Sequence, residues 1–159
     1  MKIIKKINLL NKYISNVSNV GFVPTMGGLH KGHISLIKKS KKMAEKTLVS
    51  IFVNPTQFDK KRDFLKYPRN LKMDLTKLRK AKVDFVFIPS VSEIYFKKRK
   101  KKIAINKKYK ILCSKFRIGH FEGVLDVIGR FLTIINPKFI FLGEKDYQQF
   151  FLVKKYFKK

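Results

Sequence analysis

The sequence predicts an α/β fold built on a doubly wound parallel sheet. Short runs that are almost continuously apolar, at 20–24, 47–53 and 139–142, alternate with stretches whose apolar residues recur at helical spacing. Strands with apolar side chains on both faces are typical of parallel sheets that helices cover from both sides. Polar segments follow these three strands, and such sheets bind ligands at the carboxyl ends of their strands. We therefore expect a Rossmann-like layer with one ligand crevice.

The first half of the chain alternates between helices and strands. Apolar residues at helical spacing predict an N-terminal helix over 3–17, which precedes the strand at 20–24. A second amphipathic stretch predicts a helix over 34–43. The β-branched and aromatic run 47–53 ends at an Asn-Pro pair, as a buried strand before a turn does. Residues 56–70 are expected to form a polar loop.

The second half continues this alternation, and proline residues stop two of its elements. A strand over 83–88 ends before one proline, and a long helix over 120–136 ends before another. The remaining expected elements are, in chain order, a helix over 71–78, a minor strand over 103–106, a strand over 139–142 and a helix from 144 or 145 to 157.

The length and composition fit one domain that covers residues 1–159. Of the 159 residues, 45% are hydrophobic, which suits a single domain with its own core. The lone cysteine, Cys113, excludes an internal disulfide, fits a reducing compartment such as the cytoplasm and is expected to be a core thiol. Polar residues interrupt 1–19, so no signal peptide is expected. The longest candidate for a membrane span, 124–135, carries two charges.

The net charge of +28 raises the alternative of a basic nucleic-acid-binding module. The run 97–102 consists only of lysine and arginine, as a basic patch or targeting signal does. The other lysines are spread over the whole chain, which favours a solvated surface over a dedicated nucleic-acid site. We expect no dedicated nucleic-acid partner, but an electrostatic field that attracts ATP and other anions.

A His-x-Gly-His motif, His30 to His33, predicts an ATP phosphate site. It follows a strand and a Gly-Gly turn and opens a helix, where unpaired backbone N–H groups and the helix dipole favour anions. The i, i+3 spacing places both imidazoles on one side of the first helical turn, from which they can donate to phosphate oxygens. Gly32 lets a ligand approach the backbone. The alternative is that each histidine is a cap, a surface residue or a core residue.

Two further segments at strand ends favour the same crevice. Gly143 to Asp146 again joins a strand to a helix, and Lys145 could neutralise phosphate charge there. Asp146 could bind ribose hydroxyls or cap the helix. Gln57 and Gln149 each offer a hydrogen-bond donor and an acceptor without adding charge that would compete with phosphate. Two such amides facing one crevice favour a small-molecule site over surface decoration.

Five segments in order, at 21–33, 49–58, 67–69, 117–121 and 141–149, resemble pantothenate synthetase, also called pantoate–beta-alanine ligase. The resemblance runs from about Gly21 to the end of the chain. It implies a fold of the nucleotidylyltransferase type and the ATP-dependent joining of pantoate to beta-alanine. The reaction would proceed through a pantoyl adenylate and release pyrophosphate and then AMP. It further implies magnesium with ATP and a homodimer.

The resemblance also implies roles for individual residues. His33 would be the proton donor, with His30 and Lys145 as further catalytic residues. Gln57 and Gln149, together with Asn54, would bind the substrates pantoate and beta-alanine. Met26 is either an adenylate contact or a core methionine. The residues implied for ATP are Met26, Gly27, Gly28, Leu29, His30, Lys31, Gly32, His33, Gly143, Glu144, Lys145 and Asp146.

Two residues outside these sets carry weaker expectations. His120 is expected to support the structure rather than contact substrate. Asp74 is expected near magnesium or a lysine. No metal ligand set is predicted from the spacing of the residues.

The chain departs from the family pattern in sequence and in length. Gly28 stands where alanine is usual, Lys31 where an acidic residue is usual, and Ile118 where proline is usual. The resemblance implies a second, smaller domain after these residues, so this chain is expected to be either the nucleotide-binding half of a longer protein or a naturally shortened protein. Because that domain would shield the adenylate from water, we expect weak or no turnover from this chain alone. The alternatives are another nucleotidylyltransferase and a decayed copy that serves as a partner subunit.

Overall fold

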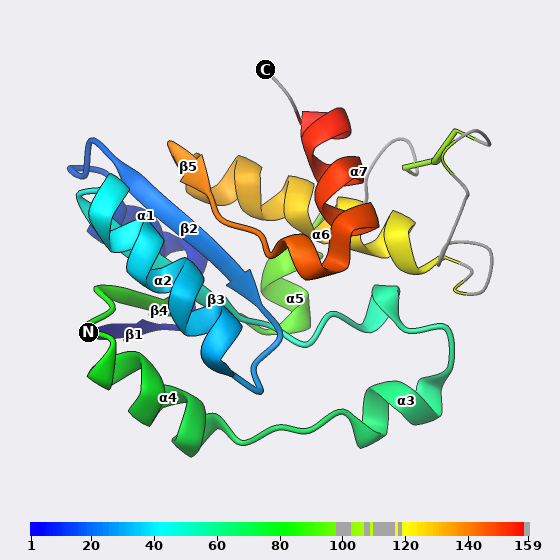
Figure 1. Ribbon diagram of the computed structural model, residues 1–159, viewed down its shortest axis with the longest axis horizontal. Coiled ribbons are helices and arrows are strands. Elements are labelled where there is room, and N and C mark those ends of the chain that lie inside the picture. The colour runs from blue at the N-terminus through cyan, green and yellow to red at the C-terminus, as the bar shows by residue number, and fades with distance from the viewer. Residues whose placement is uncertain (98–102, 107–108, 110–116, 118, 158–159) are drawn as a thin grey trace.

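The computed structural model describes residues 1–97, 103–106, 109, 117 and 119–157. Its centre is a five-stranded sheet in which every pairing is parallel, in the order β1-β4-β3-β2-β5 (Figure 1). The predicted Rossmann-like layer is confirmed. The strands are β1 (Lys2–Ile4), β2 (Val20–Thr25), β3 (Lys46–Ile51), β4 (Phe85–Phe87) and β5 (Phe139–Ile140).

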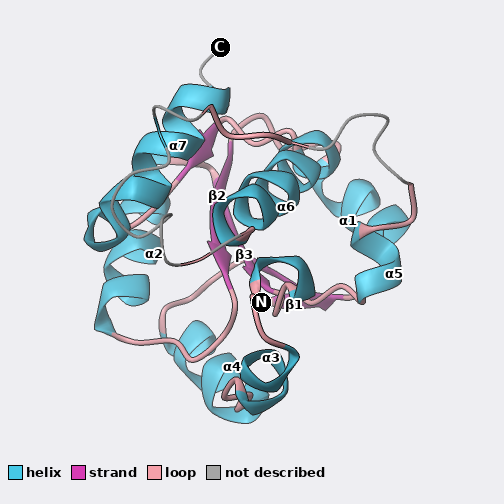
Figure 2. Ribbon diagram, turned by 90° about the vertical axis from the view of Figure 1, so that its right-hand side faces the viewer, coloured by secondary structure: helices cyan, strands magenta, loops and turns pink. Residues whose placement is uncertain are grey.

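Helices cover both faces of the sheet (Figures 1 and 2). Alternate strand residues belong to two apolar cores: Phe22 and Leu48 face one, while Val23 and Val49 face the other. The first core is closed by α1, α5, α6 and α7, and the second by α2 and α4. The described helices are α1 (Ile7–Ile14), α2 (Lys31–Met43), η1 (Pro55–Gln57), α3 (Lys61–Lys66), α4 (Leu71–Lys80), α5 (Val91–Ile94), α6 (His120–Ile135), η4 (Glu144–Asp146) and α7 (Tyr147–Phe157).

The strand order contains a topological switch point beside β2. From β2 the chain steps to β3 and then to β4, whereas β5 lies on the opposite side of β2. Connections that diverge from one point leave a crevice outside the carboxyl ends of the strands, where doubly wound sheets bind ligands. Residues 26–33 follow β2 directly and therefore lie at this crevice.

The prediction for the N-terminal half is wrong in two places. Residues 2–4 are not the start of a helix but the edge strand β1, in which Ile4 pairs with Phe87. A three-residue strand shows too little alternation to be recognised, and the spacing of Ile3 and Ile7 imitates a helical repeat. The expected polar loop 56–70 instead contains η1 and α3. Both helices are too short to show a repeating pattern of apolar and polar residues.

The region around the basic run also differs from the prediction. Residues 103–106 form no strand, although Ile105 is buried in the core. The four-residue helix α5 was not expected; it is capped by Ser90, whose hydroxyl accepts the Glu93 N–H. Of the basic run 97–102 only Lys97 is described. The predictions for Cys113 and Ile118 also lie outside the described residues.

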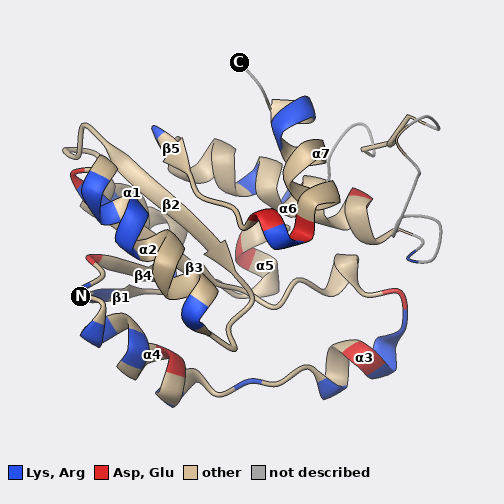
Figure 3. Cartoon of the chain, viewed as in Figure 1, with Lys and Arg blue, Asp and Glu red and all other residues tan. Residues whose placement is uncertain are grey.

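Basic residues lie on several helices of the molecule, including α1, α2, α4 and α7, rather than along one of them (Figure 3). This distribution agrees with the expectation of a solvated lysine surface. In the part of the chain that the structure describes, no helix combines the length and the apolar character needed to cross a bilayer.

Candidate functional site

A cavity of about 280 Å³ lies at the carboxyl ends of β2 and β3, against the middle of α6. It joins candidates from three separate segments of the sequence. Both histidines of the His-x-Gly-His motif line it together with both glutamines. The predicted site residues at the cavity are Met26, Gly27, His30, His33, Asn54, Gln57, Asp146 and Gln149.

The turn after β2 depends on glycine. Gly27 and Gly28 have φ angles of +83° and +62°, in the left-handed region that side chains other than glycine rarely adopt. The Thr25 hydroxyl donates to the Ser50 carbonyl at 2.7 Å and accepts the Gly27 N–H at 3.2 Å. These bonds join the turn to β3, and Gly28 in place of the usual alanine suits its backbone.

Asp74 on α4 holds the same turn from the other side. Its carboxylate is 2% exposed and accepts the N–H groups of Gly28 and Leu29 at 2.9 and 2.8 Å. Lys77, one helical turn on, donates to the Leu29 carbonyl. The sequence predicts unpaired N–H groups at this turn. Those of Gly28 and Leu29 are paired with Asp74, so the imidazoles are the stronger candidates for phosphate donors.

His30 and His33 form a reciprocal cap at the start of α2. The His30 ring accepts the Gly32 N–H on Nδ1 at 3.1 Å, and the His33 ring accepts the His30 N–H on Nδ1 at 3.4 Å. The ring centroids lie 4.1 Å apart. A neutral ring that accepts on Nδ1 carries its hydrogen on Nε2. The cap therefore leaves one Nε2–H donor on each ring, and both rings line the cavity.

Burial keeps two histidines in the neutral form. Desolvation, assisted by the electrostatic effect of the neighbouring His30 ring, lowers the pKa of His33 below its ordinary 6.5. Desolvation also lowers the pKa of His120, although its bond to the Gln57 carbonyl acts in the opposite direction. At neutral pH, His33 can donate a hydrogen bond without carrying a charge.

These pKa shifts predict a stability that falls in mild acid. The unfolded chain takes up protons near the ordinary histidine pKa, while the folded chain resists them to lower pH. The contribution of the two neutral histidines to the free energy of unfolding is complete above about pH 6.5. It is lost as the pH falls through their lowered pKa values. We expect the free energy of unfolding in urea to decrease between pH 7 and 5.5. Replacing His33 and His120 by glutamine should flatten this slope, and an unchanged slope would contradict the assignment.

Gln57 is positioned by its neighbours. Its side-chain oxygen accepts from the Asn54 amide at 3.2 Å, and its amide nitrogen lies 2.7 Å from the Met26 sulfur. The Asn54 side chain also bonds Thr56, Tyr95 and the Gly123 carbonyl. Asn54 is 1% exposed and highly bonded, so its contacts favour a role in positioning Gln57 over direct contact with substrate.

Helix α6 packs against η1 through a glycine that the sequence analysis did not select. A Cβ at Gly123 would lie 2.3 Å from the Thr56 carbonyl oxygen and 2.8 Å from the Gln57 nitrogen. His120, at the first turn of α6, has Nδ1 2.6 Å from the Gln57 carbonyl oxygen. This contact agrees with the expected supporting role of His120. The detectable signal for Gly123 was a glycine inside a strongly apolar helical pattern.

Several predicted ATP residues do not line the cavity. Leu29 is 1% exposed and belongs to the apolar core beneath α2. Lys145 lies in η4 with its side chain exposed, one residue before Asp146, which does line the cavity. The other predicted residues outside the lining are Gly28, Lys31, Gly32, Gly143 and Glu144. Their roles in binding ATP stay predictions.

The cavity has an apolar wall that the sequence analysis did not connect with the site. It includes Phe52 after β3 and, on α6, Val124, Val127, Ile128 and Phe131. Tyr67 also lines it and belongs to one of the five resembling segments. The apolar pattern of α6 predicted a core helix, and a residue that faces a cavity cannot be told from one that faces the core by periodicity alone.

Comparisons with known proteins agree with this architecture. The model of the Pantoate-beta-alanine ligase family matches residues 2–159. Pantothenate synthetases from Bartonella tribocorum and Buchnera aphidicola are 43% and 44% identical, across 98% and 100% of this chain. A crystal structure of pantoate-beta-alanine ligase from Francisella tularensis, complexed with beta-gamma ATP and beta-alanine, superposes with a TM-score of 0.93 at 43% identity over 98% of the chain. The chain spans 56% and 58% of those two relatives and 61% of the Francisella chain.

Proposed function

The chain belongs to the pantoate-beta-alanine ligase family, and we propose that it binds ATP and pantoate in the cavity beside β2 and joins them as a pantoyl adenylate. The observation that carries the proposal is the shared lining: two imidazoles suited to phosphate and two amides suited to a hydroxy acid face one space. Beta-alanine would then react with the adenylate to give pantothenate and AMP. The bound ligands of the Francisella relative support ATP and beta-alanine as substrates.

In the first step an oxygen of the pantoate carboxylate attacks the α-phosphorus of ATP. The bond from that phosphorus to the bridging oxygen breaks, and pyrophosphate leaves with the electron pair. Negative charge grows on the phosphoryl oxygens, where fixed donors stabilise it without reorganisation. The Nε2–H groups of His30 and His33 would supply such donors, since the Nδ1 atoms of both rings are occupied by the cap.

In the second step the amine of beta-alanine attacks the acyl carbon of the adenylate. The bond between that carbon and the phosphate oxygen breaks, AMP leaves and the nitrogen loses a proton. Gln57 and Gln149 would hold the pantoyl group through its hydroxyls during both steps. The apolar wall of α6 would contact the methyl groups of the pantoyl chain and exclude water from the reacting carbon.

Magnesium would enter with the nucleotide. Among the described residues no group of three or more acidic, cysteine or histidine side chains could hold a metal by itself. Mg²⁺ in nucleotide sites is held by substrate phosphates and one or two carboxylates, where it neutralises phosphate charge. Asp146 lines the cavity and fits as such a carboxylate. The homodimer stays a proposal that rests on the family resemblance, and the cytoplasmic location stays a proposal that rests on the single cysteine.

Calorimetric titration with ATP and magnesium, followed by pantoate, tests the proposal. We expect Gln149→Leu to weaken pantoate binding by about tenfold, since a lost hydrogen bond costs roughly 1.4 kcal/mol, while ATP binding is retained. Gln148→Leu is the matched control, because the neighbouring Gln148 lies outside the cavity lining and its amide bonds the Tyr109 carbonyl. Equal pantoate binding in both variants would favour another nucleotidylyltransferase activity.

A further inference from the structure

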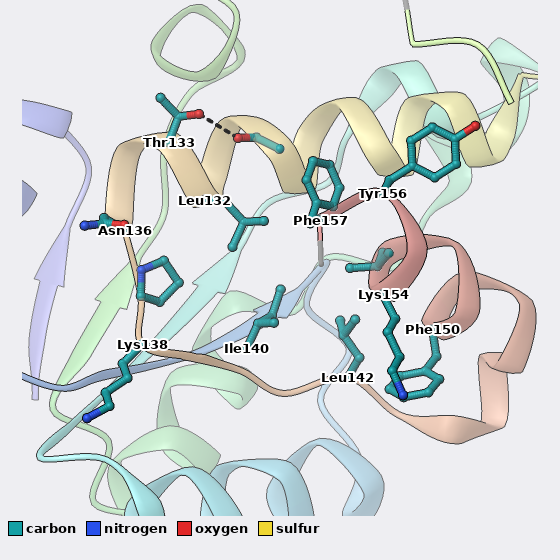
Figure 4. A pocket seen from close by; sticks show the side chains of 13 residues that line it. Leu132, Thr133, Asn136, Lys138, Ile140, Leu142, Phe150, Lys154, Tyr156 and Phe157 are labelled. Carbon is teal, nitrogen blue, oxygen red and sulfur yellow. Dashed lines mark hydrogen bonds between the residues drawn. The ribbon is translucent and has the colours of Figure 1, made fainter. Parts of the chain in front are cut away.

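Helix α6 has a face that borders neither the candidate site nor the large groove beside it. One face forms the apolar wall of the candidate site. A second face, with Leu132 and Thr133, lines a groove of about 940 Å³ that α6 shares with β5 and α7 (Figure 4). The third face carries Asp126 and Arg130, which form an ion pair of 3.1 Å. Arg130 reaches from there to the end of α5.

Arg130 holds the end of α5 and the tyrosine that follows it. Its guanidinium donates through Nη1 to the Ile94 and Lys97 carbonyls at 3.0 and 2.9 Å. The same group lies 4.5 Å from the centre of the Tyr95 ring. A guanidinium over an aromatic face is attracted to the ring, and more strongly where water is excluded. The Arg130 side chain is only 12% exposed, so the contact fixes the Tyr95 ring against α6.

The Tyr95 hydroxyl is directed at the amide of Asn54. It donates to Asn54 Oδ1 at 2.8 Å, and the Thr56 N–H and hydroxyl donate to the same oxygen at 3.2 and 3.0 Å. Burial raises the pKa of Tyr95 above its ordinary 10, although the hydrogen bonds to Thr56 and Asn54 act in the opposite direction. The hydroxyl therefore keeps its hydrogen at neutral pH and remains a donor.

The bonds to Asn54 fix the direction of the Gln57 amide. With its oxygen toward these donors, Asn54 turns its NH₂ group to the Gly123 carbonyl at 3.1 Å and to Gln57 Oε1 at 3.2 Å. The Gln57 oxygen is thus occupied, and its NH₂ group lies 2.7 Å from the Met26 sulfur in the lining of the cavity. Sulfur is a weak acceptor, and an NH₂ group carries two hydrogens. Gln57 therefore offers a donor to a ligand.

We propose that Tyr95 is a positioning residue for pantoate, which acts through Asn54 to direct the Gln57 NH₂ group at an oxygen of the substrate. This inference rests on the proposed function, because it places pantoate in the cavity. Tyr95 is not part of the cavity lining, so its hydroxyl acts through the Asn54 amide rather than by touching a ligand. A donor held in this direction favours a hydroxyl or carboxylate oxygen and disfavours a ligand group that can only donate.

The alternative is a purely structural role, in which the Tyr95 ring only packs against the apolar core. Tyr95→Phe separates the two roles, because it removes the hydroxyl and keeps the ring with its contact to Arg130. Tyr13→Phe is the matched control. Tyr13 lies on α1, outside the cavity lining, and is also half-buried. Its ring also lies beside a cation, the Lys2 ammonium, at 4.0 Å.

Calorimetric titration with pantoate, in the presence of ATP and magnesium, measures the positioning effect. We expect Tyr95→Phe to weaken pantoate binding about threefold to tenfold, the usual worth of one hydrogen bond, and to leave ATP binding unchanged. The loss should disappear when Gln57→Leu is also present, since the hydroxyl acts through Gln57. Tyr13→Phe should change neither affinity. Unchanged pantoate binding in Tyr95→Phe, an equal loss in Tyr13→Phe, or a full loss that persists beside Gln57→Leu would each overturn the inference.

NMR of the ligand-free chain tests the hydrogen bonds without the proposed function. We expect Tyr95→Phe to shift the side-chain amide signals of Asn54 and Gln57, because their hydrogen bonds rearrange, whereas Tyr13→Phe should leave both in place. If the unchanged chain binds no pantoate, the proposed function fails, and these signals alone decide whether Tyr95 directs the Gln57 amide. Signals that stay in place in Tyr95→Phe would show that it does not.

Discussion

Replacing His33 by alanine is expected to lower the rate of pantoyl-adenylate formation about 10²- to 10³-fold, or roughly 2.7–4 kcal/mol, the usual cost of removing one fixed donor to a developing oxyanion. The change removes the Nε2–H donor at the cavity and the acceptor of the His30 N–H. Pyrophosphate release in a single turnover, with the chain in excess over ATP and pantoate, measures this step without requiring product release.

Glutamine at position 33 distinguishes the loss of the donor at the cavity from the loss of the acceptor in the helix cap. Its amide nitrogen can donate at about the place of Nε2, and glutamine at this third helical position can accept the N-cap N–H as in an ordinary capping box. His33→Gln should therefore retain most of the stability and a large part of the rate. If His33→Ala and His33→Gln lose the same rate, the donor role is wrong. If neither loses rate, the cavity does not perform the proposed reaction.

Much of the fold could be predicted because its long elements carry clear periodicity. Helix α6 begins at the predicted residue and ends one residue before the predicted end, where Asn136 adopts a left-handed conformation with φ +45°. The buried strands β2 and β3 were also expected, since apolar runs on both faces are specific to covered parallel sheets. The errors fall on β1, η1, α3, α5 and the segment 103–106, which are too short for a period to be distinguished from chance.

The candidate site could be predicted where a residue has a suitable side chain and also follows the end of a strand. The two histidines follow β2, whereas Gln57 follows β3 and Gln149 follows β5. The parallel topology brings the ends of these three strands together at the cavity. Contacts between residues that lie far apart in the sequence could not be predicted. The bond from Asn54 to the Gly123 carbonyl joins residues 69 positions apart, and nothing local marks either residue as a partner of the other. The structure adds these supporting residues to the ones that chemistry alone selects.

Asp74 is the supporting residue with the largest expected effect on stability. Asp74→Asn should reduce the free energy of unfolding by about 3 kcal/mol, because a buried N–H without an acceptor costs roughly 1–3 kcal/mol. The carboxylate gives one oxygen to Gly28 N and the other to Leu29 N. An asparagine can satisfy only one of them and points its NH₂ group at the other. Urea unfolding followed by circular dichroism measures the loss.

Asp63→Asn is the matched control, because it removes the same charge from an exposed position on α3 and should change the stability by less than about 0.5 kcal/mol. Asp74→Asn should also weaken ATP binding, since the Gly27–Leu29 turn that it releases leads directly into the His30 cap. If both variants were equally stable, the turn would hold its conformation without the carboxylate. The placement of the two imidazoles would then depend on the glycines and the helix cap alone.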